Sequence, residues 1–124
     1  MHTTRPTRKT WRIPLRKDLA KEVFFQECHY VIVQGVYVHI RPGDPLHFQM
    51  KIKDGSFQDV RIANVVLVLP VTVQDYDTLV GQCKITGTAE GHFAQGAGFD
   101  SLEQYRDFYA RKGFPYSGVV LFFT

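Results

Sequence analysis

The stretch HIRPGDPLHF, residues 39–48, places two charged side chains, Arg41 and Asp44, around a proline and a glycine. An arginine held in this way could bind a phosphate or a base, because its guanidinium donates to phosphate oxygens and to base edges. The same letters also predict a plain turn, since proline presets φ at the second turn position and glycine accepts a positive φ at the third. In that interpretation an ion pair between Arg41 and Asp44 pins the turn. Both interpretations stay open at this point.

Histidine and cysteine are the other residues that could do chemistry. His39 and His47 flank the RPGD turn and would face each other across a hairpin. A zinc site needs further ligands at suitable spacing, which neither the histidines nor Cys28 and Cys83 supply. No nucleophile elbow or Walker loop is present. We therefore expect no metal and no cofactor, and we expect both cysteines to be reduced, partly buried thiols.

Positive charge is concentrated near the start of the sequence, and aromatic residues are concentrated near its end. Residues 1–21 hold seven Lys and Arg against one Asp, although the formal net charge of the whole chain is only +3. Such an arm can follow the phosphates of a polyanion, or it can be a solvated tail. Near the other end, aromatic residues are interleaved with Arg106, Arg111 and Lys112. Aromatics beside cations stack single-stranded bases, whereas most aromatics fill a core.

Length and composition bound the class of protein. A chain of 124 residues with 44% hydrophobic and 14% aromatic residues can bury one core. We expect a single domain over residues 10–124, preceded by a flexible basic arm at residues 1–9. No apolar run approaches the roughly 20 residues of a membrane span, and the N-terminus lacks the apolar centre of a signal peptide. The expected location is the cytoplasm, without a membrane partner.

Hydrophobic periodicity predicts the elements that would position these residues. Strands are expected over residues 10–15, 30–40, 46–52, 57–70 and 117–124, and helices over residues 17–28 and 101–112. Asp54 and Gly55 predict a hairpin turn. The apolar run ANVVLVLP predicts a central strand that is covered on both faces, and residues 71–98 are left unassigned. The predicted class is α+β, with a small barrel or a strongly curved sheet.

Two motifs carry a family resemblance. In HIRPGDPLHFQM a strand ending in Ile-Arg runs into a Gly-Asp turn and an apolar strand. In FAQGAGFDSLEQYRDFYARKGFPYSGVVLFF an Ala and a Gly-Phe precede a short acid-rich helix, a small-residue turn and an apolar final strand. This order, over roughly residues 30–124, resembles the ASCH domain family of the PUA-like superfamily. The resemblance implies a PUA-like curved sheet or β-barrel with two flanking helices, and a cleft for RNA or a modified nucleoside.

The resemblance also implies where catalytic residues would lie. Some relatives hydrolyse N4-acetylcytidine with a Lys-Thr pair and a carboxylate. Where Lys and Thr would follow Gly35, this chain has valine and tyrosine, and its only Lys-Thr pair is Lys9-Thr10. The segment QGAG lacks the carboxylate, for which Glu90 is the nearest candidate. An amidohydrolase or ribonuclease would therefore depend on Lys9, Thr10 and either Glu90 or another carboxylate for its base and its oxyanion donor.

The favoured hypothesis is binding of RNA or another nucleic acid by the cleft, assisted by the basic arm. The predicted contacts are Lys9, Arg12 and Arg16 to phosphate, Arg41 to phosphate or base, and Tyr37 or Tyr116 to a stacked base. An enzyme acting on a nucleoside or RNA is the second hypothesis. A protein-interaction module that uses the aromatic C-terminal surface is the third.

Overall fold

The structure is a computed structural model, and it describes residues 10–15 and 29–124. Its strands are β1 (Trp11–Pro14), β2 (Tyr30–Val33), β3 (Pro45–Lys51), β4 (Phe57–Val73), β5 (Thr78–Val80), β6 (Cys83–Ile85) and β7 (Tyr116–Phe123). Its helices are the 3₁₀ helix η1 (Gly35–His39) and the α-helices α2 (Gly87–Gly96) and α3 (Leu102–Lys112). The predicted basic arm and the helix predicted over residues 17–28 lie outside the described residues.

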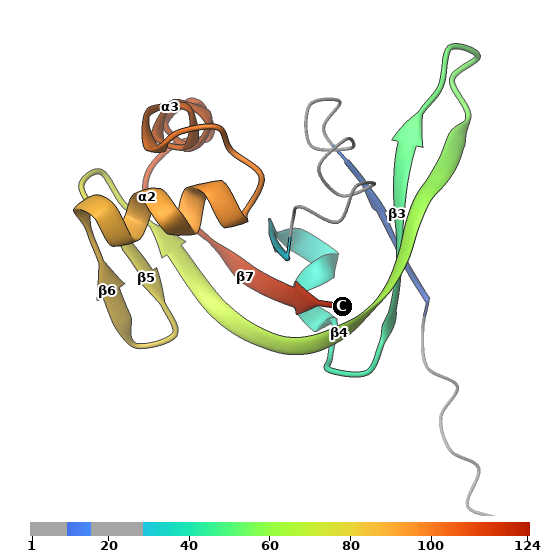
Figure 1. Cartoon of the computed structure of the whole chain (residues 1–124), viewed down its shortest axis with the longest axis horizontal. Helices are drawn as coiled ribbons and strands as arrows, with labels where there is room; N and C mark the ends of the chain where they lie inside the picture. The colour runs from blue at the N-terminus through green and yellow to red at the C-terminus, as the bar shows by residue number, and fades with distance from the viewer. Residues whose placement is uncertain (1–9, 16–28) are drawn as a thin grey trace, which may run out of the picture.

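The seven described strands form one mixed sheet, which is organised around the long, arching strand β4 (Figure 1). The first half of β4 pairs with β3, and its second half pairs with β7 and β5. Strand β1 runs parallel to β3 at one edge of the sheet, where Pro14 is tolerated. The predicted α+β class, with a curved sheet and two flanking helices, is confirmed. The sheet stays open and does not form the alternative barrel.

One prediction about β4 is wrong, namely that its apolar run is covered on both faces. Val66 and Leu67 are 56% and 44% exposed, whereas Val65 and Val71 are buried. The register of β4 against β7 is irregular between Val65 and Leu67. Antiparallel strands commonly have one face packed against the core and the other face exposed to solvent. Strand β4 does lie inside the sheet, with β3, β7 and β5 as partners, but only Val71–Val73, which follow this run, pair with two strands at the same residues.

Two clusters of buried side chains form the core. The first contains Trp11, Ile13, Val31, Val33, Ile40, Leu46, Phe48, Ala63, Val65, Leu121 and Phe123. The second contains Val73, Ala94, Ala97, Phe99, Tyr105 and Tyr109. Helices α2 and α3, which lie side by side in Figure 1, contribute Ala94, Tyr105 and Tyr109 to the second cluster. The C-terminal strand β7 contributes to the first cluster and borders the second, so it joins the two parts of the core.

Helix α3 begins and ends where the sequence predicts, whereas α2 is not predicted. The Ser101 hydroxyl accepts a hydrogen bond from the Gln104 backbone N–H at 3.1 Å, and Gly113 ends the helix with φ 98°. Helix α2 has the sequence GTAEGHFAQG, and glycine is a poor helix former. Tertiary contacts of its buried Glu90 and Ala94 hold it instead. Neither helix is long and apolar enough to cross a membrane, in the part of the chain that is described.

The RPGD segment forms the predicted turn. The Asp44 backbone N–H donates to the Arg41 carbonyl oxygen at 3.1 Å, and Gly43 has φ 92°. One carboxylate oxygen of Asp44 accepts hydrogen bonds from the Arg41 backbone N–H and from the Trp11 indole N–H, each at 3.0 Å. Asp44 therefore pins the turn through these hydrogen bonds and not through the predicted ion pair with the Arg41 guanidinium.

Replacing Asp44 with alanine should lower the free energy of unfolding by about 2 kcal/mol, because it removes the carboxylate oxygen that accepts from the Trp11 indole N–H and from the Arg41 backbone N–H. Urea unfolding followed by far-UV circular dichroism measures the change. Asp44→Asn keeps an acceptor oxygen in the same place and should lose about half as much. A loss below about 0.5 kcal/mol in Asp44→Ala would show that the carboxylate does not stabilise the turn.

The prediction for the cysteines is wrong where the structure tests it. Cys83 is exposed, because it lies in β6, a short strand at the edge of the sheet whose residues are mostly exposed. Its free thiol is therefore open to solvent rather than partly buried. Cys28 lies outside the described residues.

Candidate functional site

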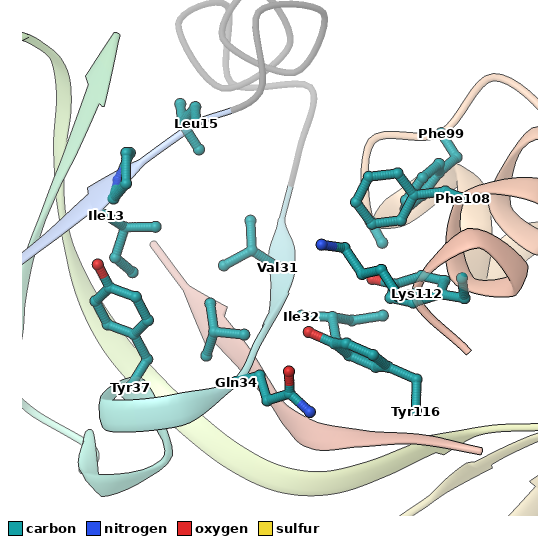
Figure 2. Close-up of a pocket in the computed structure, with 14 residues that line it drawn as sticks. Ile13, Leu15, Val31, Ile32, Gln34, Tyr37, Phe99, Phe108, Lys112 and Tyr116 are labelled. Atoms are coloured by element: carbon teal, nitrogen blue, oxygen red, sulfur yellow. The ribbon is translucent and has the colours of Figure 1, made fainter. Parts of the chain in front are cut away.

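A pocket of about 320 Å³ opens between β1 and η1 on one side and α3 on the other, with β2 along its floor (Figure 2). We call it the aromatic pocket. Its aromatic lining residues are Tyr37, Phe99, Phe108, Tyr109 and Tyr116. The pocket's volume is within the range of about 300–1,000 Å³ that is typical of small-molecule sites.

The wall made by β1 and η1 depends on the RPGD turn. The Tyr37 hydroxyl donates to the Arg12 carbonyl oxygen at 3.1 Å. Its ring packs edge-on against Trp11, with 6.2 Å between the ring centres. Trp11 is in turn bound to Asp44 through its indole N–H. The turn that opens β3 therefore helps to orient Tyr37 at the pocket, although the turn itself does not line it.

The opposite wall is formed by the last turns of α3 and the first residue of β7. The rings of Tyr109 and Tyr116 lie 4.7 Å apart, and the Lys112 ammonium lies 5.1 Å from the centre of the Phe108 ring. Figure 2 shows the Lys112 ammonium and the Tyr116 hydroxyl directed toward the interior of the pocket. A tyrosine hydroxyl is protonated at neutral pH and can donate, and burial raises the pKa of Tyr116 further.

The floor is β2, which is shorter than predicted. The strand expected over residues 30–40 ends at Val33, and Gly35, with φ 70°, begins η1. Between them Gln34 donates from its side-chain amide to the Ser117 carbonyl oxygen at 2.9 Å. Its amide oxygen points toward the pocket in Figure 2. Sequence reasoning missed Gln34, because its role depends on a residue 83 positions away in the chain.

This arrangement suits a flat ring with a polar edge. The lining is mainly aliphatic and aromatic, so an apolar ring face would be buried between the two walls. Three polar groups face the same space: the Tyr116 hydroxyl as a donor, the Gln34 amide oxygen as an acceptor, and the Lys112 ammonium as a cation. A few placed polar groups in an apolar pocket orient a ligand and select it.

The pocket brings together two of the residues that the sequence predicts, Tyr37 and Tyr116. Of the predicted arginines, the two that the structure describes, Arg12 and Arg41, do not join them. Arg12 is exposed on the face of β1 opposite to Ile13, which lines the pocket. Arg41 is exposed in the turn and is not a lining residue. Of the remaining predicted contacts, Lys9 and Arg16 lie outside the described residues.

Glu90, the predicted catalytic carboxylate, belongs to α2, and its side chain takes part in a buried polar network. Its side chain is 0% exposed, and it forms an ion pair with Arg106 of α3. Its other oxygen accepts from the Thr78 hydroxyl at 2.7 Å, and Thr78 is 2.7 Å from the Tyr105 hydroxyl. Both oxygens are thus used inside the protein. Thr10 is exposed beside β1, next to the other core cluster, so Thr10 and Glu90 do not form one site.

Arg106 extends the same network to the connection between β4 and β5. Its guanidinium donates to the Gln74 carbonyl oxygen at 3.2 Å and to the Asp75 carbonyl oxygen. Because the Thr78 hydroxyl donates its one hydrogen to Glu90, it accepts from the Tyr105 hydroxyl. Burial raises the pKa of Tyr105, which agrees with a protonated hydroxyl that donates. The network thus links α2, α3 and the β4–β5 connection. Its position inside the fold indicates a structural role.

The two histidines beside the turn do not face each other, so that prediction is wrong. His39 ends η1, whereas His47 lies in β3, whose partners are β1 and β4. His47 Nδ1 lies 3.1 Å from an Asp59 carboxylate oxygen. A hydrogen bond from Gln49 and that from His47 lower the pKa of the Asp59 carboxyl group. Over residues 10–15 and 29–124, no three His, Cys, Asp or Glu side chains lie close enough to hold a metal ion.

Comparisons of the chain with protein-family models, curated proteins and solved structures found no match. The resemblance to the ASCH family therefore stays a prediction that depends on the order of two motifs.

Proposed function

We propose that this protein binds single-stranded RNA and holds one unstacked base in the aromatic pocket. The observation that carries the proposal is the meeting of Tyr37 and Tyr116 at one pocket, from distant parts of the sequence, together with Gln34 and Lys112. Sequence-specific recognition of RNA relies on unstacked bases that stack on aromatic rings and form hydrogen bonds through their edges. The pocket offers groups for both kinds of contact.

Each polar group of the pocket has a defined task in this proposal. The Tyr116 hydroxyl donates to an acceptor on the base edge, and the Gln34 amide oxygen accepts from a base N–H group. Lys112 lies in the last turn of α3, where its ammonium can pair with a phosphate next to the base. Exposed Arg12 and Arg41 add attraction to the phosphate backbone from outside the pocket.

The amidohydrolase hypothesis gains no support from the described residues. A general base must reach the proton that it removes, and Glu90 is enclosed and bound to Arg106 and Thr78. Binding without chemistry is the simpler use of the pocket, because its polar groups are a phenol, an amide and an ammonium group.

Replacing Tyr116 with alanine should weaken RNA binding about tenfold, since stacking of one base on an aromatic side chain contributes about 1–3 kcal/mol. Fluorescence anisotropy with a labelled single-stranded RNA of roughly 12 nucleotides measures the dissociation constant. Tyr76→Ala is the matched control: Tyr76 is 86% exposed on the β4–β5 connection and does not line the pocket, so its loss should leave affinity unchanged.

Two results would overturn the proposal. One is wild-type protein that shows no salt-dependent RNA binding. The other is a Tyr116→Ala variant that is folded and binds as tightly as the wild type. Tyr116→Phe separates the two contributions of this residue, because it keeps the ring for stacking and removes only the hydroxyl donor.

A further inference from the structure

A second hollow adjoins the aromatic pocket. It has a volume of about 640 Å³ and is lined by Leu15, Met50, Lys51, Ile52 and Lys53, and we call it the hairpin hollow. Leu15 lines both the aromatic pocket and the hairpin hollow. The Leu15 backbone N–H donates to the Gln49 carbonyl oxygen at 2.8 Å, which fixes this shared border against β3. An extended ligand that leaves the aromatic pocket past Leu15 therefore enters the hairpin hollow.

The two lysines of the hairpin hollow lie at a turn that is held by backbone hydrogen bonds. The Gly55 backbone N–H donates to the Ile52 carbonyl oxygen at 3.0 Å, and the Ile52 N–H donates to the Ser56 carbonyl oxygen at 2.9 Å. Gly55 has φ 89°, as this hairpin turn requires. The backbone that carries Lys51 and Lys53 is therefore fixed at the end of the β3–β4 hairpin.

The electrostatic surroundings of these lysines favour an anion. Both Lys51 and Lys53 are exposed, and neither forms an ion pair with another residue in the described part of the chain. The neighbouring acid, Asp54, uses one carboxylate oxygen to accept from the Ser56 N–H at 2.8 Å and from the Ser56 hydroxyl at 2.6 Å. Asp54 is thus held by Ser56 and forms no ion pair with Lys51 or Lys53, so both ammonium groups are open to a ligand.

We infer that the hairpin hollow is a second contact site for the RNA strand. The nucleotides next to the base in the aromatic pocket run past Leu15, and their phosphates pair with Lys51 and Lys53. This inference rests on the proposed function. The apolar side chains of Met50 and Ile52 lie beside the lysines, where they can pack against a ribose or a base. The partner is therefore a single strand several nucleotides long and not an isolated nucleotide.

The double substitution Lys51→Gln and Lys53→Gln tests the inference. It should weaken binding of a single-stranded RNA of roughly 12 nucleotides by about tenfold at about 0.1 M salt. The slope of log affinity against log salt concentration should decrease by about 1.4, because each phosphate contact on a single strand contributes about 0.7. Binding of a nucleoside monophosphate, followed by NMR shifts of the pocket tyrosines, should not change, because that ligand does not reach the hairpin hollow.

Lys84→Gln is the control, since Lys84 is an exposed lysine on β6, at the opposite edge of the sheet from β1, where it forms an ion pair with Asp77; the variant's fold is checked by circular dichroism. It should leave both affinity and salt slope unchanged. If wild-type protein binds the RNA and Tyr116→Ala weakens it, but the double variant keeps the wild-type affinity and slope, the inference is overturned and the proposed function stands. If wild-type protein binds no RNA, both are overturned.

Discussion

Replacing Glu90 with alanine should lower the free energy of unfolding by about 3–5 kcal/mol, the largest effect that we expect from any polar substitution. Glu90 is 0% exposed, and both of its carboxylate oxygens have partners, Arg106 on one side and Thr78 on the other. Its removal leaves the Arg106 guanidinium partly buried without its counter-charge. It also leaves the Thr78 hydroxyl, which is fully buried, without its acceptor.

Urea unfolding followed by circular dichroism measures this loss, and Asp107→Ala serves as its control. Asp107 is an acid on α3, like Arg106, but it is exposed, so its replacement should change stability by at most about 0.5 kcal/mol. Glu90→Gln should lose less than Glu90→Ala, because the amide oxygen can still accept from Thr78. A loss below about 1 kcal/mol in Glu90→Ala would show that the network does not stabilise the fold.

Replacing Gly118 with alanine should lower the free energy of unfolding by about 3 kcal/mol and should also weaken RNA binding. A Cβ atom on Gly118 would lie 2.2 Å from the Val33 carbonyl oxygen. That oxygen belongs to the backbone of β2, which is paired in register with β7, so it cannot move without breaking the pairing. Val33 and Gln34 line the floor of the aromatic pocket, and the pocket would be distorted with them.

Thermal unfolding and the RNA anisotropy assay measure the two effects of Gly118→Ala. Gly91→Ala is the control, because Gly91 lies inside α2 and a Cβ there would meet no atom within 4 Å. Alanine is the better helix former, so Gly91→Ala should stabilise the protein by up to about 1 kcal/mol. Wild-type stability in Gly118→Ala would contradict the close approach of β2 and β7.

Features with a local cause are those that the sequence predicts well. The RPGD and DGS turns depend on proline and glycine dihedral angles within four residues, and both are present. Helix α3 is delimited by the Ser101 cap and by Gly113, which act within one turn of its ends. The α+β class follows from the same periodic patterns, because strands and helices alternate in a recognisable order.

Predictions fail where the cause is not local. Helix α2 contains three glycines, and its sequence does not predict a helix; it forms because Glu90 and Ala94 are buried against the rest of the protein. The exposed face of β4 could not be predicted either, since it depends on which elements cover the arching sheet. Likewise, nothing in the sequence around Glu90 indicates that Arg106 and Thr78 enclose it.

The candidate site also has features that the sequence predicts and features that depend on the tertiary structure. The residue types by themselves determined that tyrosines and cations were available for stacking and for phosphate, and Tyr37 and Tyr116 were predicted on that basis. Only the tertiary structure decided that these two tyrosines meet at one pocket, that Gln34 and Lys112 join them, and that Arg12 faces the other way. The physical reason is that turns and helix caps depend on neighbours a few residues away, whereas the pocket depends on pairing between β2 and β7 and on packing of α3, which join distant segments of the chain.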